Sequence, residues 1–465
     1  MFGIKSKNRS QVNRHSMDMT QGSITKQLIS FAFPLLVGNL FQQLYNTVDT
    51  WVVGNFVSET AFAAVGNMGP IVNMFIGFFL GFSAGTSALI SQNFGAKNED
   101  AIEKLVHTAM VMTFIVGIIF TFAGHLLTPL LLDFAKIPDS VRPEAKAYLS
   151  IYFSGILGLV FYNMGAAILR AVGDSKRPFY FLVVCAVLNT ALDLLFVLAF
   201  GMKVEGVALA TIISQGVSAI LIIISLMRSQ SCIRLQFKKL SVNRHLLGRI
   251  IALGIPSALQ VSITSFSNIF VQSYINYFGE FCMAGYTAYS KIDMLLFLPA
   301  QSISLATTTF VGQNLGCGQI KRARKGVTNS ILLSVAVTAV LMVPVLIFSE
   351  FVVRFFIPEA EDAVNFGILF LRYITPFYLL TCFNQVYASA LRGAGNARAP
   401  MFIMIASYVA FRQVYLAIMS TVWNEVIPIA MGYPLGWILC CCIFMIYYYT
   451  TPLDRHFKPV DNSRT

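Results

Sequence analysis

Residues 169–178, LRAVGDSKRP, return 222 positions later as LRGAGNARAP at 391–400, with Leu, Arg, Gly and Pro in register. A second segment, SQNFGAKNEDA (91–101), matches GQNLGCGQIKR (312–322) at an offset of 221. Two pairs of single residues share the offset of 222: Pro34 with Pro256, and Asn46 with Asn268. Four matches at nearly one offset indicate that the chain is an internal duplication.

The chain around these repeats is apolar over most of its length. Of its 465 residues, 56% are hydrophobic and only 12% are charged. A water-soluble fold would not bury so many apolar residues, whereas twelve membrane spans of roughly 20 residues each would absorb about 240 of them. The composition therefore excludes a soluble enzyme. The low charge density excludes a disordered protein, and the length excludes a small disulfide-stapled secreted domain.

Twelve apolar runs long enough to cross a membrane follow one another along the chain. Their approximate limits are 28–53, 61–90, 105–131, 147–168, 179–200, 206–227, 250–275, 283–311, 327–348, 364–389, 401–422 and 426–449. The predicted fold class is an all-α integral membrane protein with twelve transmembrane helices. Each half holds six spans, an even number, so both halves enter from the same side and the repeats are parallel. We expect two six-helix lobes with a central cavity between them.

This arrangement divides the chain into five segments. We expect an N-terminal tail at 1–27, an N-terminal lobe at 28–227, a basic linker at 228–249, a C-terminal lobe at 250–449 and a C-terminal tail at 450–465. The N-terminal tail leads directly into a full-length span, so no cleaved signal peptide is expected. The eight cysteines lack the spacing of metal ligands and are interpreted as free, buried and structural.

The net charge of +12 lies mainly in the loops between these spans. If the N-terminus is cytoplasmic, the inside segments hold 25 Lys and Arg residues. The outside segments hold five: Lys136, Arg142, Lys146, Lys203 and Arg354. Cationic loops resist translocation, so this imbalance predicts that both chain ends are cytoplasmic. The charges therefore indicate membrane orientation, and no clustered motif supports nucleic-acid binding.

Six ionisable residues fall inside the predicted spans, where an uncompensated charge costs several kcal/mol. They are Asp49, Asp193, Lys291, Asp293, Arg372 and Arg412. At 1.5 Å per residue, Asp49, Asp193 and Thr211 lie roughly 8–10 Å inside the outer ends of their helices. Asn189 precedes Asp193 by one helical turn and shares its face.

This set of oxygen ligands suits a Na⁺ ion held by Asp49 and Asp193, or a pair of carboxyl groups that shares a proton. The alternative is that each aspartate is a satisfied hydrogen-bonding group near the interface. The internal repeat is a control, because Val271 and Tyr415 stand where the second half would carry the two aspartates. The fold does not need carboxylates at these positions, which favours a functional site confined to the N-terminal lobe.

The ionisable residues of the C-terminal half form a second possible polar site. Lys291 and Asp293 are two positions apart and point to different sides of their helix. Arg412 could pair with Asp293, and we prefer a structural ion pair to the alternative of a role in substrate or proton passage. Arg372 is expected to snorkel toward the membrane surface and receives no role.

Two features of the first two spans bear on helix geometry. Pro34 precedes Asp49 in the same helix and removes a backbone donor. It could act as a hinge that responds to the charge of Asp49, although a static kink is equally consistent. Gly77, Gly81 and Gly85 recur at every fourth position of the second span and predict close helix packing.

The chain resembles the multidrug and toxic compound extrusion (MATE) family over essentially its whole length. The resemblance rests on FPLLVGNLFQQLYNTVDTWVVGN (33–55), on SQNFGA and GQNLGC after spans 2 and 8, and on the paired LRAVGD and LRGAGN loops. It implies a V-shaped, two-lobed efflux antiporter that opens to each side of the membrane in turn and is driven by Na⁺ or H⁺. The bacterial cytoplasmic membrane is the expected location.

The pattern is most similar to the DinF-like branch of that family. This similarity implies a cation site and a bent first helix, whose residues map to Asp49, Asn189, Asp193, Thr211, Asn163 and Pro34. The NorM-like branch has carboxylates in helices 7 and 10. Here those spans offer Gln260, Asn384 and Gln385 instead, which disfavours a cation site in the C-terminal lobe.

The resulting prediction is a cation-coupled antiporter that exports amphipathic, cationic organic compounds by alternating access. It is not expected to be an enzyme or to hold a cofactor, and H⁺ or Na⁺ would be the coupling ion. Its expected partners are drug-like small molecules and membrane lipid, with no nucleic acid, and it is expected to act as a monomer. The alternatives are a flippase of a lipid-linked headgroup and a non-transporting membrane sensor or scaffold.

Overall fold

The computed structural model describes residues 17–135, 137–357 and 360–457, and these residues form helices and connecting loops without a β-strand. The first half comprises α1 (Ile24–Phe56), α2 (Glu59–Gly95), α3 (Glu99–Phe134), α4 (Arg142–Ser154), α5 (Ile156–Ala171), α6 (Lys176–Leu194), the π-helix η1 (Leu195–Ala199) and α7 (Val204–Met227). A 3₁₀ turn, η2 (Phe237–Lys239), lies between the halves.

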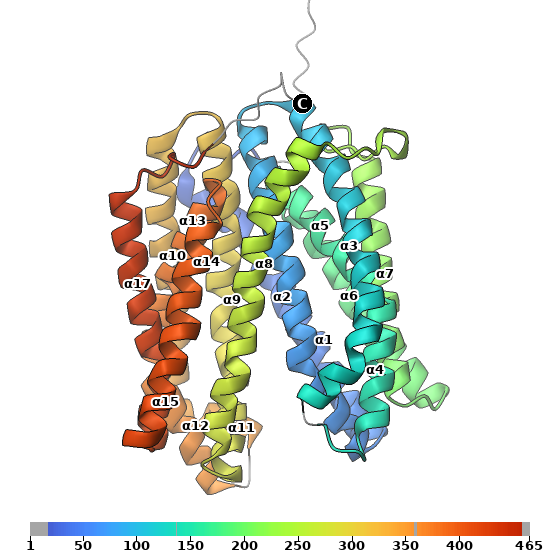
Figure 1. Ribbon diagram of the computed structural model, residues 1–465, viewed down its shortest axis with the longest axis vertical. Helices are drawn as coiled ribbons and strands as arrows, with labels where there is room; N and C mark the ends of the chain where they lie inside the picture. The colour runs from blue at the N-terminus through green and yellow to red at the C-terminus, as the bar shows by residue number, and fades with distance from the viewer. Residues whose placement is uncertain (1–16, 136, 358–359, 458–465) are drawn as a thin grey trace, which may run out of the picture.

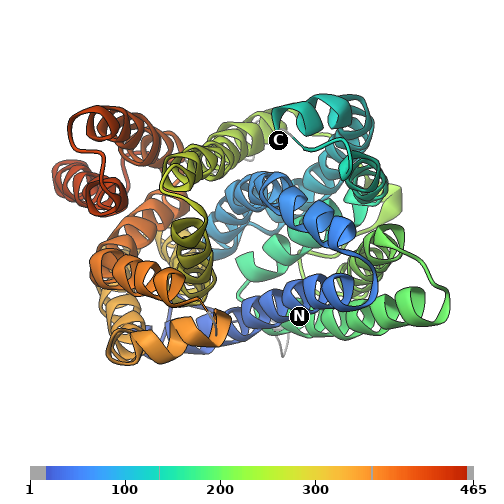
Figure 2. The same ribbon diagram turned by 90° about the horizontal axis from the view of Figure 1, so that it is seen from below.

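The second half repeats this order with more breaks. It comprises α8 (Arg244–Asn276), α9 (Glu280–Gly316), α10 (Ile320–Ile347), α11 (Ser349–Phe356), α12 (Glu361–Ile374), the 3₁₀ turn η3 (Thr375–Phe377), α13 (Tyr378–Gly393), α14 (Arg398–Ile405), the π-helix η4 (Ala406–Phe411), α15 (Arg412–Val422), α16 (Val426–Ala430) and α17 (Gly432–Thr450). The two halves form two groups of helices that lie side by side (Figures 1 and 2).

Eleven helical segments of the described residues are long and apolar enough to cross a membrane, and a bent pair of helices supplies the twelfth. This agrees with the twelve predicted spans. The bent pair is α4 and α5, which meet at 47° around Gly155, so the predicted span 147–168 is not one straight helix. A Cβ atom on Gly155 would lie 2.3 Å from the Cβ of Ile212 in α7, so the bend occurs where α7 packs directly on the backbone.

The two lobes meet through α2 and α8, whose backbones are in contact. Cβ atoms on Gly81 and Gly85 would lie 2.4–2.7 Å from the backbone of Ser257, Ala258 and Gly254 in α8. Small residues at this spacing allow two membrane helices to approach closely. The close packing predicted from the glycine spacing of the second span is therefore confirmed.

Helix α1 links the lobes. Leu28, Phe31 and Leu35 near its start are buried against Ile303 and Phe310 of α9. Farther along, α1 packs against α6 of the first lobe (Figure 1). One helix therefore connects the contact between the lobes with the region around Asp49.

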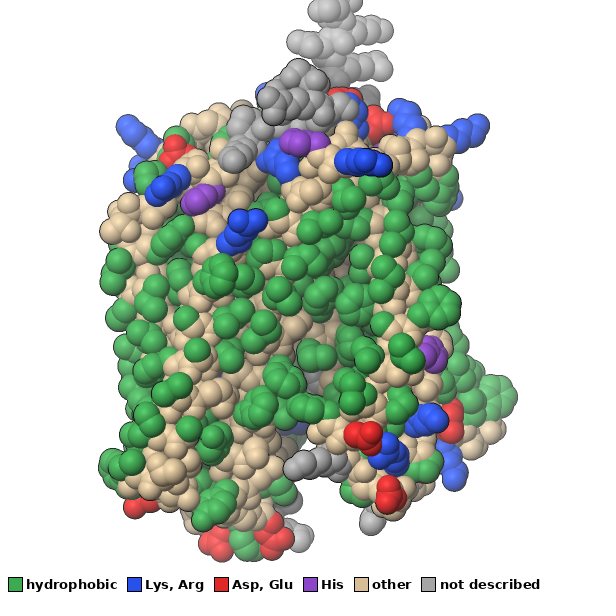
Figure 3. All heavy atoms as spheres, viewed as in Figure 1, with side chains coloured by type: hydrophobic (Ala, Val, Ile, Leu, Met, Phe, Trp, Pro, Cys, Tyr) green, Lys and Arg blue, Asp and Glu red, His purple; other side chains and the backbone are tan. Residues whose placement is uncertain are grey.

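Most Lys and Arg side chains gather at the end of the molecule that carries both ends of the described chain (Figure 3). We call this the basic end, and it includes the loops 96–98, 172–175, 228–243, 317–319 and 394–397. The lobes meet there, whereas a cleft separates them at the opposite end (Figure 3). Of the segments discussed above, 1–16, Lys136 and 458–465 lie outside the described residues.

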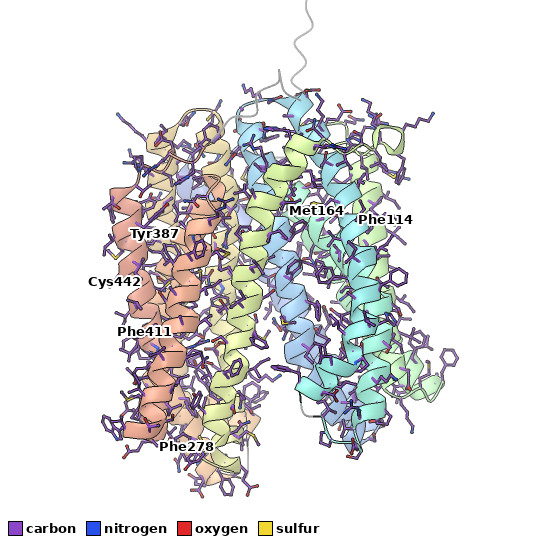
Figure 4. All side chains as sticks on the ribbon, in the orientation of Figure 1. Phe114, Met164, Phe278, Tyr387, Phe411 and Cys442 are labelled. Carbon is purple, nitrogen blue, oxygen red and sulfur yellow. The ribbon has the colours of Figure 1, made fainter. Side chains whose placement is uncertain are left out.

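The eight cysteines are free, as expected, but they are not all buried. Cys317 and Cys442 are exposed. Cys442 and Phe114 project from the outer faces of α17 and α3 (Figure 4). Apolar side chains on these faces suit contact with lipid, so the exposure of Cys442 follows from its place on a lipid-facing helix.

Candidate functional site

Asp49 and Asp193 meet in the first lobe, near the opposite end. Asp49 lies seven residues before the end of α1, and Asp193 is the residue before the last of α6. Asp49 is 7% exposed and Asp193 is fully buried. The two carboxyl groups lie within electrostatic range of one another, and Asn189 and Thr211 lie beside Asp49. The structure thus brings together four of the five residues predicted to bind the coupling ion.

Most polar atoms of this site lack a hydrogen-bond partner among the described residues. Among the described residues, no hydrogen bond reaches Oδ1 of Asp49, either carboxylate oxygen of Asp193 or either amide atom of the Asn189 side chain. The Thr211 hydroxyl donates to the carbonyl oxygen of Val207 at 3.0 Å and so keeps its oxygen available as an acceptor. Buried polar groups are nearly always paired, so these oxygens are suited to a small cation or a proton.

The site does not resemble a transition-metal centre. No group of three or more His, Cys, Asp or Glu side chains comes together in the described part of the chain. Two carboxylates supplemented by amide and hydroxyl oxygens suit a hard monovalent ion, and two adjacent carboxyl groups also suit a shared proton. The donor set therefore fits both coupling ions, Na⁺ and H⁺.

Two tyrosines of α4 lie near the site, one of them within electrostatic range of the carboxylates. Tyr148 lies within electrostatic range of both Asp49 and Asp193, and Tyr152 stacks on Tyr148 with ring centroids 6.3 Å apart. Both tyrosines are buried. Reasoning from the sequence missed them, although their four-residue spacing places them on one helical face. Tyr148 thus adds a buried aromatic side chain close to the two carboxylates.

The π-helix η1 begins two residues after Asp193 and ends the helix that carries it. A π-helix replaces the usual i→i−4 hydrogen bonds by longer ones, and such segments often lie at functional sites. Here the amide of Phe200 donates to the carbonyl of Leu195 at 3.2 Å. Asp193 thus stands at the point where the regular backbone pattern of its helix changes.

A cavity of about 280 Å³ lies one helical turn from the carboxylates, toward the basic end. Each of three helices supplies a lining residue four positions from a site residue: Tyr45 with Asp49, Cys185 with Asn189, and Gln215 with Thr211. The wall is completed by α8 and α9 of the second lobe, through Val261 and Phe297 among others. The carboxylate site and the cavity therefore share the same helices.

The cavity wall combines amide and aromatic side chains with aliphatic ones. Asn163 belongs to this wall and donates to the carbonyl of Leu159 at 2.9 Å in its own helix, so its predicted part in the cation site stays a prediction. Pro34 also lines the cavity, within the continuous helix α1, and its role as a hinge stays a prediction. Among the described lining residues, Arg170 carries the one permanent charge, and none is a carboxylate.

In the second lobe, Asp293 and Arg412 do not form the predicted ion pair. Asp293 accepts a hydrogen bond from the hydroxyl of Tyr289 at 2.7 Å. Arg412 donates to Ser267 Oγ at 2.9 Å and to Asn268 Oδ1 at 2.8 Å. No ion pair between Asp293 and Arg412 is present in the described structure, so the preference for one was wrong.

A pair of tyrosines explains the separation. The hydroxyls of Tyr286 and Tyr433 lie 2.7 Å apart, and both tyrosines interact electrostatically with Asp293 and with Arg412. The guanidinium of Arg412 also lies 4.8 Å from the centroid of the Tyr433 ring. Cation–π attraction and neutral hydrogen-bond acceptors therefore stabilise this buried cation in place of a carboxylate.

Lys291 is exposed and makes no ion pair with any residue that the structure describes. It lies three residues before Met294 and seven before Leu298, and both of these line the cavity. Helical spacing thus places Lys291 on the cavity-facing side of α9, nearer the opposite end. Arg372 is exposed on α12, as expected for a snorkelling residue.

A family model described as MatE matches residues 34–195 and 256–446, which together span most of the chain. The chain belongs to the MATE family. The two matched segments of this MATE protein begin at Pro34 and Pro256, which are equivalent positions of the internal repeat. Family membership and the many apolar helices make it a multi-pass membrane protein.

Several relatives of this MATE protein carry transporter names. It is 31% identical to the probable multidrug resistance protein YpnP of Bacillus subtilis (strain 168) over 435 residues, which cover 93% of this chain and 96% of YpnP. It is 27% identical to the probable multidrug resistance protein NorM of Thermotoga maritima, over 83% of each chain. A Shewanella oneidensis protein named FAD transporter is 23% identical over 77% of this chain and 80% of its own length.

Solved structures share its fold. A structure described as the outward-facing conformation of a multidrug resistance MATE family transporter has a TM-score of 0.87 at 23% identity, and the match covers 94% of this chain and 98% of that one. A crystal structure of MATE in complex with MaL6 has the same TM-score, over 93% and 97% of the two chains. The predicted two-lobed MATE fold is therefore confirmed.

Proposed function

We propose that this MATE protein is a cation-coupled multidrug efflux antiporter of the bacterial cytoplasmic membrane, which acts as a monomer and exports amphipathic organic compounds by alternating access. The observation that carries the proposal is the buried pair Asp49 and Asp193 beside a cavity between the lobes, with three carboxylate oxygens that accept no hydrogen bond from the described residues. The names of its relatives as multidrug resistance proteins support the export of small organic molecules.

Coupling follows from the chemistry of the two carboxylates. H⁺ or Na⁺ bound at Asp49 and Asp193 reduces their negative charge, whereas their release restores it. A cationic centre on the cargo is attracted only to the charged form, so ion and cargo compete for the site. A site that must empty before it reloads enforces exchange of one for the other.

The open cleft lies at the end away from the basic end (Figure 3). With the basic end in the cytoplasm, as the distribution of Lys and Arg predicts, this conformation faces outward and would release cargo and admit the coupling ion. Export then requires the basic end to open while the cleft closes. The assignment to the DinF-like branch also stays a prediction.

The proposal is tested by transport in proteoliposomes. Purified protein is reconstituted with ethidium as cargo, and Na⁺ and H⁺ gradients are imposed separately. We expect ethidium to move against at least one of the two gradients, and the gradient that drives it identifies the coupling ion. Absence of transport under every gradient would reject the antiporter in favour of a sensor or scaffold.

A flippase of lipid-linked headgroups would need a strongly cationic cavity that opens sideways to the bilayer. Among the described residues that line the cavity, Arg170 is the one cation, so the cavity is not strongly cationic. The same vesicles distinguish the two functions. A flippase would move a labelled anionic lipid between leaflets, whereas an antiporter of organic cations would leave its distribution unchanged.

A further inference from the structure

We propose that Arg170 docks an anionic group of the cargo, such as a carboxylate or a phosphoryl group, at the basic end of the cavity. The proposal rests on the proposed export function and names the chemistry of its substrates. It predicts that compounds with an acidic group, including those that also carry an amine, are recognised more tightly than their neutralised derivatives.

The first observation is that the Arg170 side chain has no hydrogen-bond or ion-pair partner among the residues that the structure describes. It makes no hydrogen bond or ion pair with a described side chain or carbonyl, and its interaction with Tyr162 is electrostatic only. Both residues line the cavity. Arg170 is only partly buried, and none of its side-chain nitrogen atoms is among the buried polar atoms that lack a hydrogen-bond partner. The guanidinium is therefore accessible to a molecule in the cavity.

The second observation is that the equivalent arginine of the second half, Arg392, has side-chain hydrogen-bond partners. Arg392 lies 222 positions later and does not line the cavity. Its NH1 donates to Gln260 Oε1 at 3.2 Å, and its NH2 donates to Ser389 Oγ at 2.8 Å. The residues at the matching positions of the first half are Gly38 and Ala167, which have no side-chain acceptor.

The first lobe has thus kept the arginine and lacks both side chains that satisfy its counterpart. Gly38 itself lines the cavity and carries no side chain, so the acceptor that Gln260 supplies in the second lobe has no counterpart at this position. An arginine that only stabilised the fold would be expected to have acceptors in both halves. The difference points to an acceptor other than the described residues, and the cavity gives a bound molecule access to this position.

The chemistry of the guanidinium defines that acceptor. Its planar array of donors matches the two oxygens of a carboxylate or phosphoryl group, and such charge-assisted pairs are stronger than neutral hydrogen bonds. A poorly hydrated cavity strengthens the attraction further. Arg170 precedes the last residue of α5 at the basic end, whereas Asp49 and Asp193 lie beyond the other end of the cavity. A cargo with both an acid and an amine would therefore be held in one orientation.

The test uses two dyes that differ at one group. Rhodamine 110 carries a free carboxylate, and rhodamine 123 is its methyl ester. Binding of each dye to the purified full chain is measured by fluorescence anisotropy in wild type, Arg170→Gln and Arg392→Gln. We expect Arg170→Gln to weaken binding of the free acid about tenfold or more and to change binding of the ester less than twofold. Arg392→Gln should leave the preference between the dyes unchanged.

Further variants separate docking from folding. Arg170→Lys keeps the charge and should retain part of the preference for the free acid. Gly38→Gln restores the acceptor of the second lobe and should weaken binding of the acid while the arginine remains. Equal effects of Arg170→Gln on both dyes, or no effect on either, would overturn the proposal. Gradient-driven efflux of the ester would in that case still support the export function.

The same anion chemistry could be supplied by a lipid headgroup, and the measurement distinguishes this source. Dye binding is repeated in nanodiscs of phosphatidylcholine with and without phosphatidylglycerol. We expect the acid preference to persist in both. If phosphatidylglycerol abolishes the preference in wild type, Arg170 holds a lipid headgroup, and the assignment to cargo is overturned.

Discussion

Gln92 and Gln313 make equivalent hydrogen bonds across the boundary between the lobes. Nε2 of Gln92 in α2 donates to the carbonyl oxygen of Gly393 at 2.9 Å, and Nε2 of Gln313 in α9 donates to that of Ala171 at 3.0 Å. Ala171 and Gly393 are themselves equivalent positions of the internal repeat. The paired SQNFG and GQNLG segments thus form a pseudo-symmetric closure of the basic end.

The helices around this closure touch backbone to backbone. A Cβ atom on Gly95 would lie 1.9 Å from the carbonyl oxygen of Gln313, and one on Gly316 would lie 2.0 Å from that of Gln92. The backbone amide of Met19 donates to Gln313 Oε1 at 2.9 Å, so the segment before α1 joins the contact. Opening the basic end must break both glutamine hydrogen bonds.

Replacing both glutamines by alanine should open the basic end more often. Each hydrogen bond contributes roughly 1 kcal/mol net, so the loss of two shifts the ratio of open to closed molecules about thirtyfold. Spin labels attached through Glu99→Cys and Lys321→Cys, with Cys317 and Cys442 replaced by serine, report the separation of the lobes by pulsed EPR. We expect a larger population at long distances in Gln92→Ala/Gln313→Ala.

The matched control is Gln272→Ala on α8, whose side chain bonds only to Asn276 on the exposed surface of the same helix. Its distance distribution should equal that of the unsubstituted protein. Gln313→Ala should produce a larger change than Gln92→Ala, because Gln313 also accepts the hydrogen bond from the Met19 amide. An unchanged distribution in the double variant would show that the glutamines do not hold the lobes together.

Asp49→Asn and Asp193→Asn should each reduce gradient-driven efflux at least tenfold. The asparagine keeps the size of the side chain and removes its ability to release a proton or to neutralise Na⁺. Because the two carboxylates act as one unit, the double variant should be no worse than either single variant. Efflux of ethidium from cells is measured at matched protein abundance, with the exposed Asp139→Asn as control. Normal coupled efflux in either single variant would remove that residue from the coupling site.

Arg412→Ala should destabilise the second lobe. The change removes two charge-assisted hydrogen bonds to α8 and the contact with the Tyr433 ring, which together contribute about 2–4 kcal/mol. Thermal unfolding in detergent should therefore show a lower midpoint than wild type, with Arg412→Lys in between. Arg372→Ala removes an exposed arginine of the same lobe and should change the midpoint little. Equal midpoints for Arg412→Ala and wild type would contradict the structural role.

The features that repeat along the chain could be predicted from the sequence. Twelve spans follow from apolar runs, and the meeting of Asp49 with Asp193 follows from their equal depth and their absence from the second repeat. The bend at Gly155 could not be predicted, because it depends on Ile212 of another helix. Contacts between helices are set by packing, and hydrophobic periodicity does not encode them.

The same distinction applies to the arginines. The sequence shows Arg412 and Asp293 in one lobe, but only the packing of α17 places Tyr433 against the guanidinium. Arg170 and Arg392 lie in nearly identical motifs, so the motif alone does not reveal that Arg392 donates two side-chain hydrogen bonds to described residues and Arg170 donates none. Gly38 and Ala167 lie outside that motif. Their importance is visible only in the structure, where their counterparts Gln260 and Ser389 accept hydrogen bonds from Arg392.

Cysteine labelling should establish which side of the membrane the basic end faces. Cys317 follows α9 at the basic end and is exposed, whereas Cys232 lies between α7 and α8. If the basic end is cytoplasmic, a membrane-impermeant maleimide should label Cys317 in inverted vesicles and not in intact cells. Cys317→Ser is the control that identifies the signal. Labelling of Cys317 in intact cells would reverse the predicted orientation.

Cys232 supplies an internal reference for reactivity in the same experiment. Burial, together with the negative charge of Glu99, raises the pKa of its thiol to about 11. Only the thiolate reacts, so at pH 8 about one molecule in a thousand is reactive at this position, compared with roughly a quarter of an unperturbed thiol of pKa about 8.5. The labelling rate of Cys232, followed by peptide mass spectrometry, should therefore be roughly 200-fold below that of a free thiol. It should rise tenfold per pH unit between pH 7 and 9, and a rate that levels off in this range would show that the thiol pKa is not raised.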